Sequence, residues 1–595
     1  MIINCKNQNS KYETHCSEDQ KISGWGIGNF RKMVIPQIQY LQIIFVFLFC
    51  VDISSGQNWQ NYPYAPGNSF LNFPSDDGYH PAPNTSTEWW YINLSLTGSA
   101  PAFKKYSVML CYFRFANMRI FNIASETDKS FNNDVLQAFP VLNFQLNHWD
   151  LTYTKIPPNA VNDYSKWTYQ ANGVPYSYIY HAEDPVHNNG LDVTVTSNRP
   201  PLVVGANGYI ALGDKGDSSF YYSYSNMNVK GKIKYKGVTD NITSGIAWID
   251  RQYGPFTVGV NSSNLYEWFS LQLDEPGTIL GVPNNPAEFN IWQIFSDSTS
   301  VPYKAEWRLV SGIYPDDSQD TSSSFIFERT GYWYDPGEGK YYSQGWRFIN
   351  PAKDITVDLY PPVKDQLVDV TLFRFWEGGV NLKGVIQNKN VDGVGFAEIV
   401  AGHKFQIVVP SIPQGLNLNS FPDHNSLTWQ PSNPGTFPIG GYRIFRSTSN
   451  DGHWKYLGST TNLNYDDYTP TPDSAYYYSI TSFDNQTGTS ASDYSASVFA
   501  APLTSNELFD LNINANIFPN PINKTSKIQI YLTKMESIKI EVYDLPGRKV
   551  RSIFNSSMAA GMNSIDFLSG GLGQGTYLLK IETERQKRTL KFVEM

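Results

Sequence analysis

The chain has 595 residues and a formal net charge of −9. This length exceeds what one hydrophobic core supports, so several domains are expected. The negative charge, without a basic block along the chain, argues against a nucleic-acid partner. Aromatic residues make up 15% of the chain and charged residues only 17%, and 44 Gly and 36 Pro supply many turns. This balance is typical of a mostly β protein.

An apolar run at residues 40–51 is followed by small residues at 54–56. The run is too short to span a bilayer comfortably, but it has the pattern of a secretory signal peptide. We expect cleavage near Gly56, so that residues 1–56 are a signal region. Of the 4 cysteines, Cys111 alone would remain in the mature protein. That excludes an internal disulfide, and the apolar strand around Cys111 indicates a buried thiol.

The next part of the chain contains an internal sequence repeat. Asn-Val-Lys-Gly at 228–231 precedes an apolar strand at 245–250, and Asn-Leu-Lys-Gly at 381–384 precedes a similar strand at 393–398. In each second strand, an aromatic residue is followed two positions later by a carboxylate. The repeat predicts two similar β-barrels in tandem. We place them at residues 57–260 and 261–408.

Residues 409–505 have a different character. Trp429 ends an early strand, and a Tyr-rich strand occupies residues 475–481. A Trp near the second strand and a late Tyr-rich strand, in a segment of this length, resemble a fibronectin type III domain. The resemblance implies a spacer or an adhesive sandwich rather than a catalytic domain.

Four short motifs mark the last segment, residues 513–595. They are Phe-Pro-Asn-Pro at 518–521, Tyr-Asp-x-x-Gly-Arg at 543–548, Gly-Thr-Tyr at 575–577 and Lys-Phe-Val at 591–593. Together they resemble the type A C-terminal sorting domain of the type IX secretion system. The resemblance implies export through the periplasm of a Gram-negative bacterium, contact with the type IX machinery, and a secreted or cell-surface location.

Several motifs within residues 76–398 also occur together in one family. The first is the segment from Asp76 to His80, which precedes Glu-Trp-Trp-Tyr at 88–91. The others are Gly-x-Ala-Trp-x-Asp at 245–250, Phe-Trp-Glu-Gly at 375–378 and Gly-x-Gly-Phe-x-Glu at 393–398. This set resembles the AttH-like family, which includes the carotenoid 1,2-hydratases. The resemblance implies two lipocalin-like β-barrels. The expected fold class is therefore all-β, with two tandem lipocalin-like β-barrels, a fibronectin type III sandwich and a small C-terminal β-sandwich.

The chemistry implied by that resemblance suits the residues present. Hydration of an isolated carbon–carbon double bond needs a proton donor, a shielded site and a water, and we expect no cofactor and no metal. A carboxylic acid desolvated among aromatic rings can stay protonated near neutral pH, and the rings can stabilise a developing cation. Asp250 is the first candidate acid and Glu88 the second, with His80 as acid–base group or as the residue that orients Glu88. The candidate ligand-binding side chains are Trp89, Trp90, Tyr91, Trp248, Tyr222 and Trp376.

Structural roles for these acids remain open at this point. Asp250 can instead pair with Arg251, and the repetition of the carboxylate as Glu398 favours a requirement of the fold. The hydratases carry a His-x-Trp pair where residues 220–225 read Phe-Tyr-Tyr-Ser-Tyr-Ser. The sequence therefore predicts a secreted protein that binds an apolar small molecule or lipid, with hydro-lyase chemistry left open. The alternatives are a lipid-binding protein without catalysis and a cell-surface glycan-binding protein. The oligomeric state is not indicated.

Overall fold

The computed structural model describes residues 59–594. Within that range, residues at the following positions are not described: 100–103, 115–116, 138–140, 158, 169–175, 213–216, 257–264, 278–286, 296–304, 371–372, 422, 472–473, 487–489, 502–512, 524–525, 533–534, 568–569 and 584–586. The predicted signal region lies outside the described residues.

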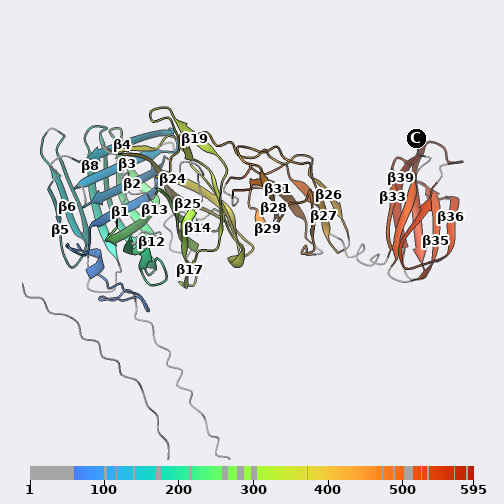
Figure 1. Ribbon diagram of the computed structural model, residues 1–595, viewed down its shortest axis with the longest axis horizontal. Coiled ribbons are helices and arrows are strands. Elements are labelled where there is room, and N and C mark those ends of the chain that lie inside the picture. Colours follow the sequence, from blue (N-terminus) through green and yellow to red (C-terminus); the bar gives the residue numbers. More distant parts are fainter. Residues whose placement is uncertain are drawn as a thin grey trace, which may run out of the picture. The chain divides into compact units, whose positions relative to one another are not determined.

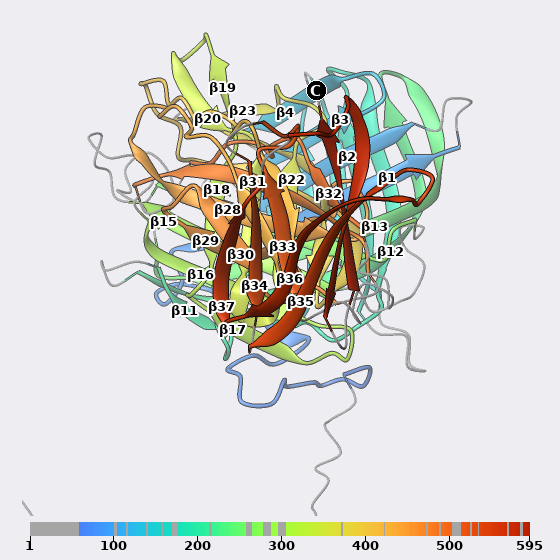
Figure 2. The same cartoon turned by 90° about the vertical axis from the view of Figure 1, so that its right-hand side faces the viewer.

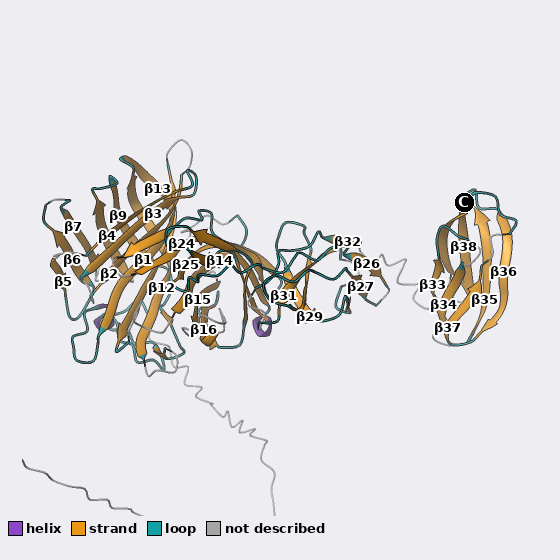
Figure 3. Cartoon of the chain, turned by 45° about the horizontal axis from the view of Figure 1, so that its top comes forward, coloured by secondary structure: helices purple, strands orange, loops and turns teal. Residues whose placement is uncertain are grey.

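Strands dominate the described residues (Figure 3). Two short 3-10 helices, η1 (Ser75–Asp77) and η2 (Pro351–Lys353), are present, and no α-helix occurs in this part of the chain. A search of the same residues finds no helix long and apolar enough to cross a membrane. The predicted all-β class is confirmed.

The first large sheet has the strand order β4-β3-β2-β1-β13-β12-β9-β8-β7-β6-β5, and its pairings are antiparallel. β10 and β11 pair with β12 beside this path. The sheet curls around its own core in blue to green in Figure 1. Its strands are β1 (Thr87–Gly98), β2 (Lys105–Phe113), β3 (Met118–Ser125), β4 (Ser130–Leu136), β5 (Val141–Phe144), β6 (Asp150–Lys155), β7 (Val161–Trp167), β8 (Ser177–Asp184), β9 (Asn189–Ser197), β10 (Leu202–Val203), β11 (Tyr209–Ala211), β12 (Ser218–Tyr235) and β13 (Val238–Gly254).

The second large sheet repeats this plan with the order β17-β16-β15-β14-β25-β24-β22-β21-β18. β23 pairs with β24 beside this path, and β19 and β20 form a separate hairpin. Its strands and that hairpin are β14 (Leu265–Asp274), β15 (Ala287–Phe295), β16 (Ala305–Ile313), β17 (Gln319–Ser322), β18 (Ile326–Arg329), β19 (Tyr332–Asp335), β20 (Lys340–Ser343), β21 (Trp346–Asn350), β22 (Ile355–Tyr360), β23 (Leu367–Val370), β24 (Phe373–Ile386) and β25 (Lys389–Ile399).

Each copy of the internal sequence repeat forms one hairpin, β12–β13 in the first sheet and β24–β25 in the second. Asn228 of β12 lies opposite Ile246 of β13, and Asn381 of β24 lies opposite Val394 of β25. The two hairpins therefore share their sequence pattern and the register at this asparagine, although β12 and β13 pair with two irregularities that β24 and β25 lack. β13 then pairs with β1, and β25 pairs with β14, so each hairpin closes back on the first strand of its own meander. This is the arrangement expected of a duplicated barrel.

We propose that each of the two large sheets forms one domain, with the limits predicted from the sequence, residues 57–260 and 261–408.

Two small sandwiches follow the two large sheets. The first has sheets β26-β27-β30 and β29-β28-β31-β32, with Trp429 and Tyr478 in its core. Its strands are β26 (Asn417–Ser420), β27 (Asn425–Thr428), β28 (Ile439–Ser447), β29 (Lys455–Thr460), β30 (Asn464–Asp467), β31 (Tyr476–Asp484) and β32 (Val498–Ala500).

The first small sandwich is bound to the second large sheet through buried charges. Arg443 Nε donates to Glu328 Oε1 over 2.6 Å, and the Tyr494 hydroxyl donates to Asp358 over 2.7 Å. Arg347 lies between them, paired with Asp358 and stacked 4.1 Å over the Tyr494 ring. These contacts attach the sandwich, for which the sequence suggested a spacer or adhesive role, to the neighbouring sheet.

The second small sandwich has sheets β33-β34-β37 and β36-β35-β38-β39 (Figure 2, orange-red to dark red). Its strands alternate buried and exposed positions, as in β34, so that one face of each sheet fills the core. They are β33 (Ile513–Phe518), β34 (Lys527–Leu532), β35 (Glu536–Asp544), β36 (Lys549–Met558), β37 (Gly561–Asp566), β38 (Gly575–Thr583) and β39 (Lys587–Glu594).

Candidate functional site

The central strands β1 and β13 divide the predicted site residues between two faces of the first sheet. Tyr91 lies opposite Asp250, and Asn93 lies opposite Trp248. Because successive strand residues point to opposite faces, these four side chains share one face. That face packs against the second sheet in a buried cluster that we call the inter-sheet cluster. Its aromatic members include Trp89, Tyr91, Tyr221, Trp248, Tyr266, Trp268, Trp292, Phe375 and Phe396.

Asp250 lies within the inter-sheet cluster and is only 4% exposed. Its carboxylate accepts hydrogen bonds from the Tyr221 hydroxyl at 2.5 Å, Ser223 Oγ at 2.6 Å and Trp248 Nε1 at 3.1 Å. Burial raises the pKa of this carboxyl to about 7, although the three donors act in the opposite direction. A substantial fraction of Asp250 is therefore protonated near neutral pH, as an acid catalyst requires.

Two further acids enter the same cluster from the second sheet. Glu377 of β24 lies directly opposite Glu398 of β25. The Tyr91 hydroxyl donates to Glu377 Oε1 over 2.8 Å, and the Tyr266 hydroxyl donates to Glu398 Oε1 over 2.7 Å. Burial and the charge of Glu398 raise the pKa of Glu377 well above its usual value. Burial, together with the charge of Asp250, raises the pKa of Glu398 to about 7.

These three acids lack the positive partners that usually accompany buried carboxylates. Among the described residues, no Lys, Arg or His nitrogen lies within 4.0 Å of any of them. Nor does this part of the chain contain a group of His, Cys, Asp and Glu side chains placed to hold a metal ion. A buried acid without a counter-charge is neutral in its most stable form. The apolar surroundings of the cluster therefore favour the protonated form of these carboxyl groups.

The raised pKa of Asp250 fixes the sign of a pH effect on stability. The carboxyl ionises near pH 3.8 in the unfolded chain and at about pH 7 in the folded protein, so the folded protein binds more protons between these values. Stability contributed by Asp250 therefore falls as the pH rises from about 4 to about 7, and is constant above that range. We expect the free energy of unfolding of Asp250→Asn, measured with urea at a series of pH values, to decline by about 2–4 kcal/mol less across this window than that of the unmodified protein. An unchanged decline would contradict the assignment.

The opposite face of β1 and β13 holds Glu88, which the structure does not bring to Asp250. Glu88 is fully buried and accepts from Arg251 Nη2 and from His80 Nδ1, each at 2.9 Å. The Arg251 guanidinium lies 4.2 Å over the Trp90 ring. The suggested Asp250–Arg251 pair is thus absent, since the two side chains point to opposite faces. His80 lies against Glu88, the residue that it was predicted to orient, and is hydrogen-bonded to it.

His80 is also held by the groups around it. Its ring stacks on Tyr253 with 3.5 Å between centroids, and its Nε2 lies 3.4 Å from Asp76. Burial lowers the pKa of the imidazole, but hydrogen bonds with Asp76 and Glu88 outweigh it and the pKa lies above its usual value. His80 and Glu88 therefore form an ion-paired network that supports the strands.

Another buried acid, Asp77, lies inside the first sheet, where the sequence indicated none. Tyr222, Tyr178 and Tyr224 donate to its carboxylate over 2.5, 2.7 and 3.0 Å. Burial raises its pKa to about 6. Phe73 and Leu71 pack into the same core, so the segment around η1 fills the interior of the first sheet. Tyr222, predicted to contact a ligand, instead anchors this segment.

Trp376 points into the second sheet's own core. Its ring packs near Trp346, and its Nε1 donates to the Lys364 carbonyl over 2.6 Å. The neighbouring Glu377 and Phe375 therefore face the inter-sheet cluster. Of the predicted ligand-binding side chains, Trp89, Tyr91 and Trp248 lie with Asp250, whereas Trp90, Tyr222 and Trp376 belong to the two sheet interiors.

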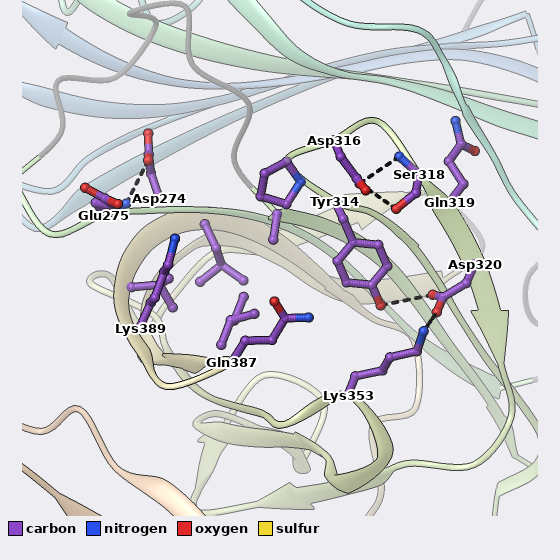
Figure 4. A pocket seen from close by; sticks show the side chains of 15 residues that line it. Asp274, Glu275, Tyr314, Asp316, Ser318, Gln319, Asp320, Lys353, Gln387 and Lys389 are labelled. Carbon is purple, nitrogen blue, oxygen red and sulfur yellow. Dashed lines mark hydrogen bonds and ion pairs between the residues drawn. The ribbon is translucent and has the colours of Figure 1, made fainter. Parts of the chain in front are cut away.

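One surface pocket, of about 810 Å³, opens at an end of the second sheet (Figure 4). Its wall carries Lys353, which forms an ion pair with Asp320, and Tyr314, whose hydroxyl donates to the same carboxylate over 3.0 Å. Lys389 lies on the opposite side of the pocket. None of the predicted site residues lines it. We therefore place the candidate site at the inter-sheet cluster.

Residues 64–402 match the model of the AttH-like family, which covers both large sheets. The chain belongs to the AttH-like family. Residues 516–594 match the model of a secretion system C-terminal sorting domain. No match was found among curated proteins.

Solved structures similar to the AttH-like region include a putative AttH from Nitrosomonas europaea. It shares 19% identity, with 57% of this chain and 99% of that chain covered and a TM-score of 0.43. Another is kievitone hydratase from Nectria haematococca, with 15% identity, coverage of 57% and 98%, and a TM-score of 0.38. A segment of two fibronectin type III domains from chicken tenascin shares 10% identity, with 30% and 97% covered and a TM-score of 0.13.

The sorting domain places this AttH-like protein at the cell surface or outside the cell and makes the type IX secretion machinery its partner. Deletion of residues 513–595 should therefore leave the protein in the periplasm, because the export signal is lost while the two large sheets are untouched. Cell fractionation and immunoblotting measure the distribution, with Lys527→Ala on the exposed side of β34 as a control. Normal export of the truncated chain would refute the role of this segment.

Proposed function

We propose that the AttH-like region binds an extended apolar molecule, an isoprenoid or another lipid, at the inter-sheet cluster and protonates it through Asp250. The observation that carries this proposal is a buried carboxyl that accepts hydrogen bonds from a phenol and an indole and has no ion-pair partner among the described residues. Burial raises its pKa to about 7. An acid in such a place can deliver a proton to a carbon–carbon double bond.

The rings around Asp250 suit the next step of such a reaction. Trp248, Trp268 and Trp292 are each at most 5% exposed, so water is largely excluded from their faces. Each aromatic face can stabilise a nearby cation by about 0.5–2 kcal/mol. Hydro-lyase or isomerase chemistry on an alkene is therefore the reaction class that we propose, and it needs no cofactor.

A lipid-binding protein without catalysis is the second candidate. It is favoured by a structural use of one of the acids, since Tyr91 of the first sheet donates to Glu377 of the second and so ties the two sheets together. Glycan binding has less support at these residues. Trp89, Trp90, Trp248 and Trp376 are at most 7% exposed and pack among apolar side chains, which would leave the hydroxyls of a sugar without hydrogen-bond partners.

The test uses the full-length protein. Mass spectrometry of its organic extract should show a co-purified apolar molecule. Incubation with squalene in D2O should then incorporate deuterium at alkene carbons, which reports protonation whether hydration or isomerisation follows. A bound lipid without deuterium incorporation would support the non-catalytic alternative. An empty extract together with no incorporation would overturn the proposal.

A further inference from the structure

The second sheet contributes two carboxyl groups to a site whose first acid comes from the first sheet. Glu377 and Glu398 are directly opposite residues of neighbouring strands, and such residues have Cβ atoms about 4.5–5.5 Å apart. Each carboxylate receives a single side-chain hydrogen bond from the described residues, from Tyr91 and Tyr266 respectively. Two ionised carboxylates at this separation, in apolar surroundings and without a cation, repel each other strongly.

Every titratable group that faces this pair is neutral or acidic. Tyr91 comes from β1, Asp250 from β13 and Tyr266 from β14. Cys111 of β2 lies close enough that burial and the charges of Glu377, Glu398 and Asp250 raise the pKa of its thiol. No neighbouring group in the described part of the chain thus supplies positive charge, so a shared proton is what relieves the repulsion.

The two glutamates differ in their access to water. Glu377 is 3% exposed, whereas Glu398 is partly exposed even though burial dominates the shift of its pKa. Water can therefore reach the pair from the side of Glu398, while Asp250 on the neighbouring sheet remains at 4% exposure. Acid and base are thereby separated, with the base on the wetter side.

We propose that Glu377 and Glu398 act as one acid–base pair that holds a single proton and accepts the proton of the water that adds to the substrate. This inference rests on the proposed function of Asp250 and assigns the reaction to hydration. The O–H bond of Asp250 breaks as a C–H bond forms, which leaves a carbocation. The oxygen of water bonds to the cationic carbon, and one water proton passes to the ionised member of the pair. Transfer of a proton from the pair to Asp250 resets the site, and the net change is addition of one water.

The first test needs no ligand and uses the full-length chain. Infrared difference spectroscopy across a pH titration should show a protonated-carboxyl band that persists at pH values where exposed carboxyls are ionised. Glu377→Gln should remove part of this band. In Glu398→Gln the band of Glu377 should persist with its midpoint moved to lower pH, because the neighbouring negative charge is gone. The exposed Glu183→Gln is the matched control and should leave the band unchanged.

The outcomes separate this inference from the proposed function. An unmoved midpoint in Glu398→Gln, or the absence of the band, overturns the shared proton whatever Asp250 does. Glutamine can still accept the tyrosine hydrogen bond, and because Glu398 is partly exposed its variant should fold even if the Glu377 variant does not.

The second test uses squalene in a mixture of D2O and ¹⁸O-labelled water. Glu398→Gln should lower ¹⁸O incorporation about 10²–10⁴-fold while deuterium exchange through Asp250 continues. Loss of both labels to the same extent, or deuterium without ¹⁸O in the unmodified protein, would overturn the assignment of the pair as the base for water.

Discussion

Replacement of Asp250 by asparagine should lower deuterium incorporation into squalene by about 10²–10⁴-fold, which is the usual contribution of a positioned general acid. The amide has no proton to give at neutral pH, so the first step fails. The fold should survive the change. The amide oxygen can accept from Tyr221, and the Ser223 hydroxyl, now 2.6 Å from the carboxylate, can rotate to accept from the amide nitrogen. Only Trp248 Nε1, now 3.1 Å from the oxygen that also accepts from Ser223, loses its acceptor.

A second aspartate on the same strand offers a matched control. Asp240 of β13 is also buried, and it accepts from the Tyr106 hydroxyl at 3.3 Å and the Ser99 backbone at 2.8 Å. It lies at the far end of the strand from Asp250, away from the inter-sheet cluster. Asp240→Asn should leave turnover unchanged. Equal loss in both variants would mean that the strand, and not the acid, is what turnover requires.

Strand alternation explains how much of the site the sequence predicts. The pairing of Trp248 with Asp250 on one face follows from a period of two, and the structure places both in the same cluster. The same rule separates Trp90 from Trp89 and Trp376 from Glu377. Applied strictly, it selects Phe375 and Glu377 of the Phe-Trp-Glu-Gly motif. The aromatic content drew attention to Trp376 instead.

Other features of the site depend on contacts that no local pattern reveals. Glu398 occupies the position of Asp250 in the duplicated hairpin. From the sequence, this repetition favoured a structural role for the carboxylate over a catalytic one. Only the packing of one sheet on the other brings the two acids into electrostatic range. Tyr266 and Tyr91 likewise become hydrogen-bond donors to acids of the second sheet through tertiary pairing. The fold class was predictable because duplication, turn residues and aromatic strands are local signals. The acid cluster was not, because it is a product of assembly.

Glu88 shows the opposite error, in which a local motif suggested chemistry. Its place among Trp89, Trp90 and Tyr91 resembles that of a desolvated acid. The structure supplies a counter-charge from Arg251, 163 residues along the chain. The distinction between a candidate acid and an ion-paired acid therefore rests on a long-range partner.

Replacement of Arg251 by methionine should destabilise the first sheet by about 3–5 kcal/mol, because it removes the guanidinium that pairs with the buried Glu88 and leaves only the His80 imidazole beside that carboxylate. Arg251 is fully buried and also donates to the carbonyls of Trp89 and Gly78, each over 2.6 Å. Urea unfolding followed by hydrogen exchange of β1 and β13 peptides measures the loss for this sheet alone. Lys232→Met is the control, since its partner Asp192 is exposed and such pairs contribute about 0–1 kcal/mol.

The double variant Arg251→Met with Glu88→Gln distinguishes the causes of that loss. An amide at position 88 needs no counter-charge, so part of the stability should return if the isolated charge is responsible. No recovery would assign the loss to the orphaned carbonyls instead. Because β1 and β13 carry Tyr91 and Asp250 on their other face, the Arg251 network fixes the register on which the acid site depends. Arg251→Met should therefore also weaken proton delivery by Asp250, although the Arg251 side chain contacts none of the three carboxyl groups of the inter-sheet cluster.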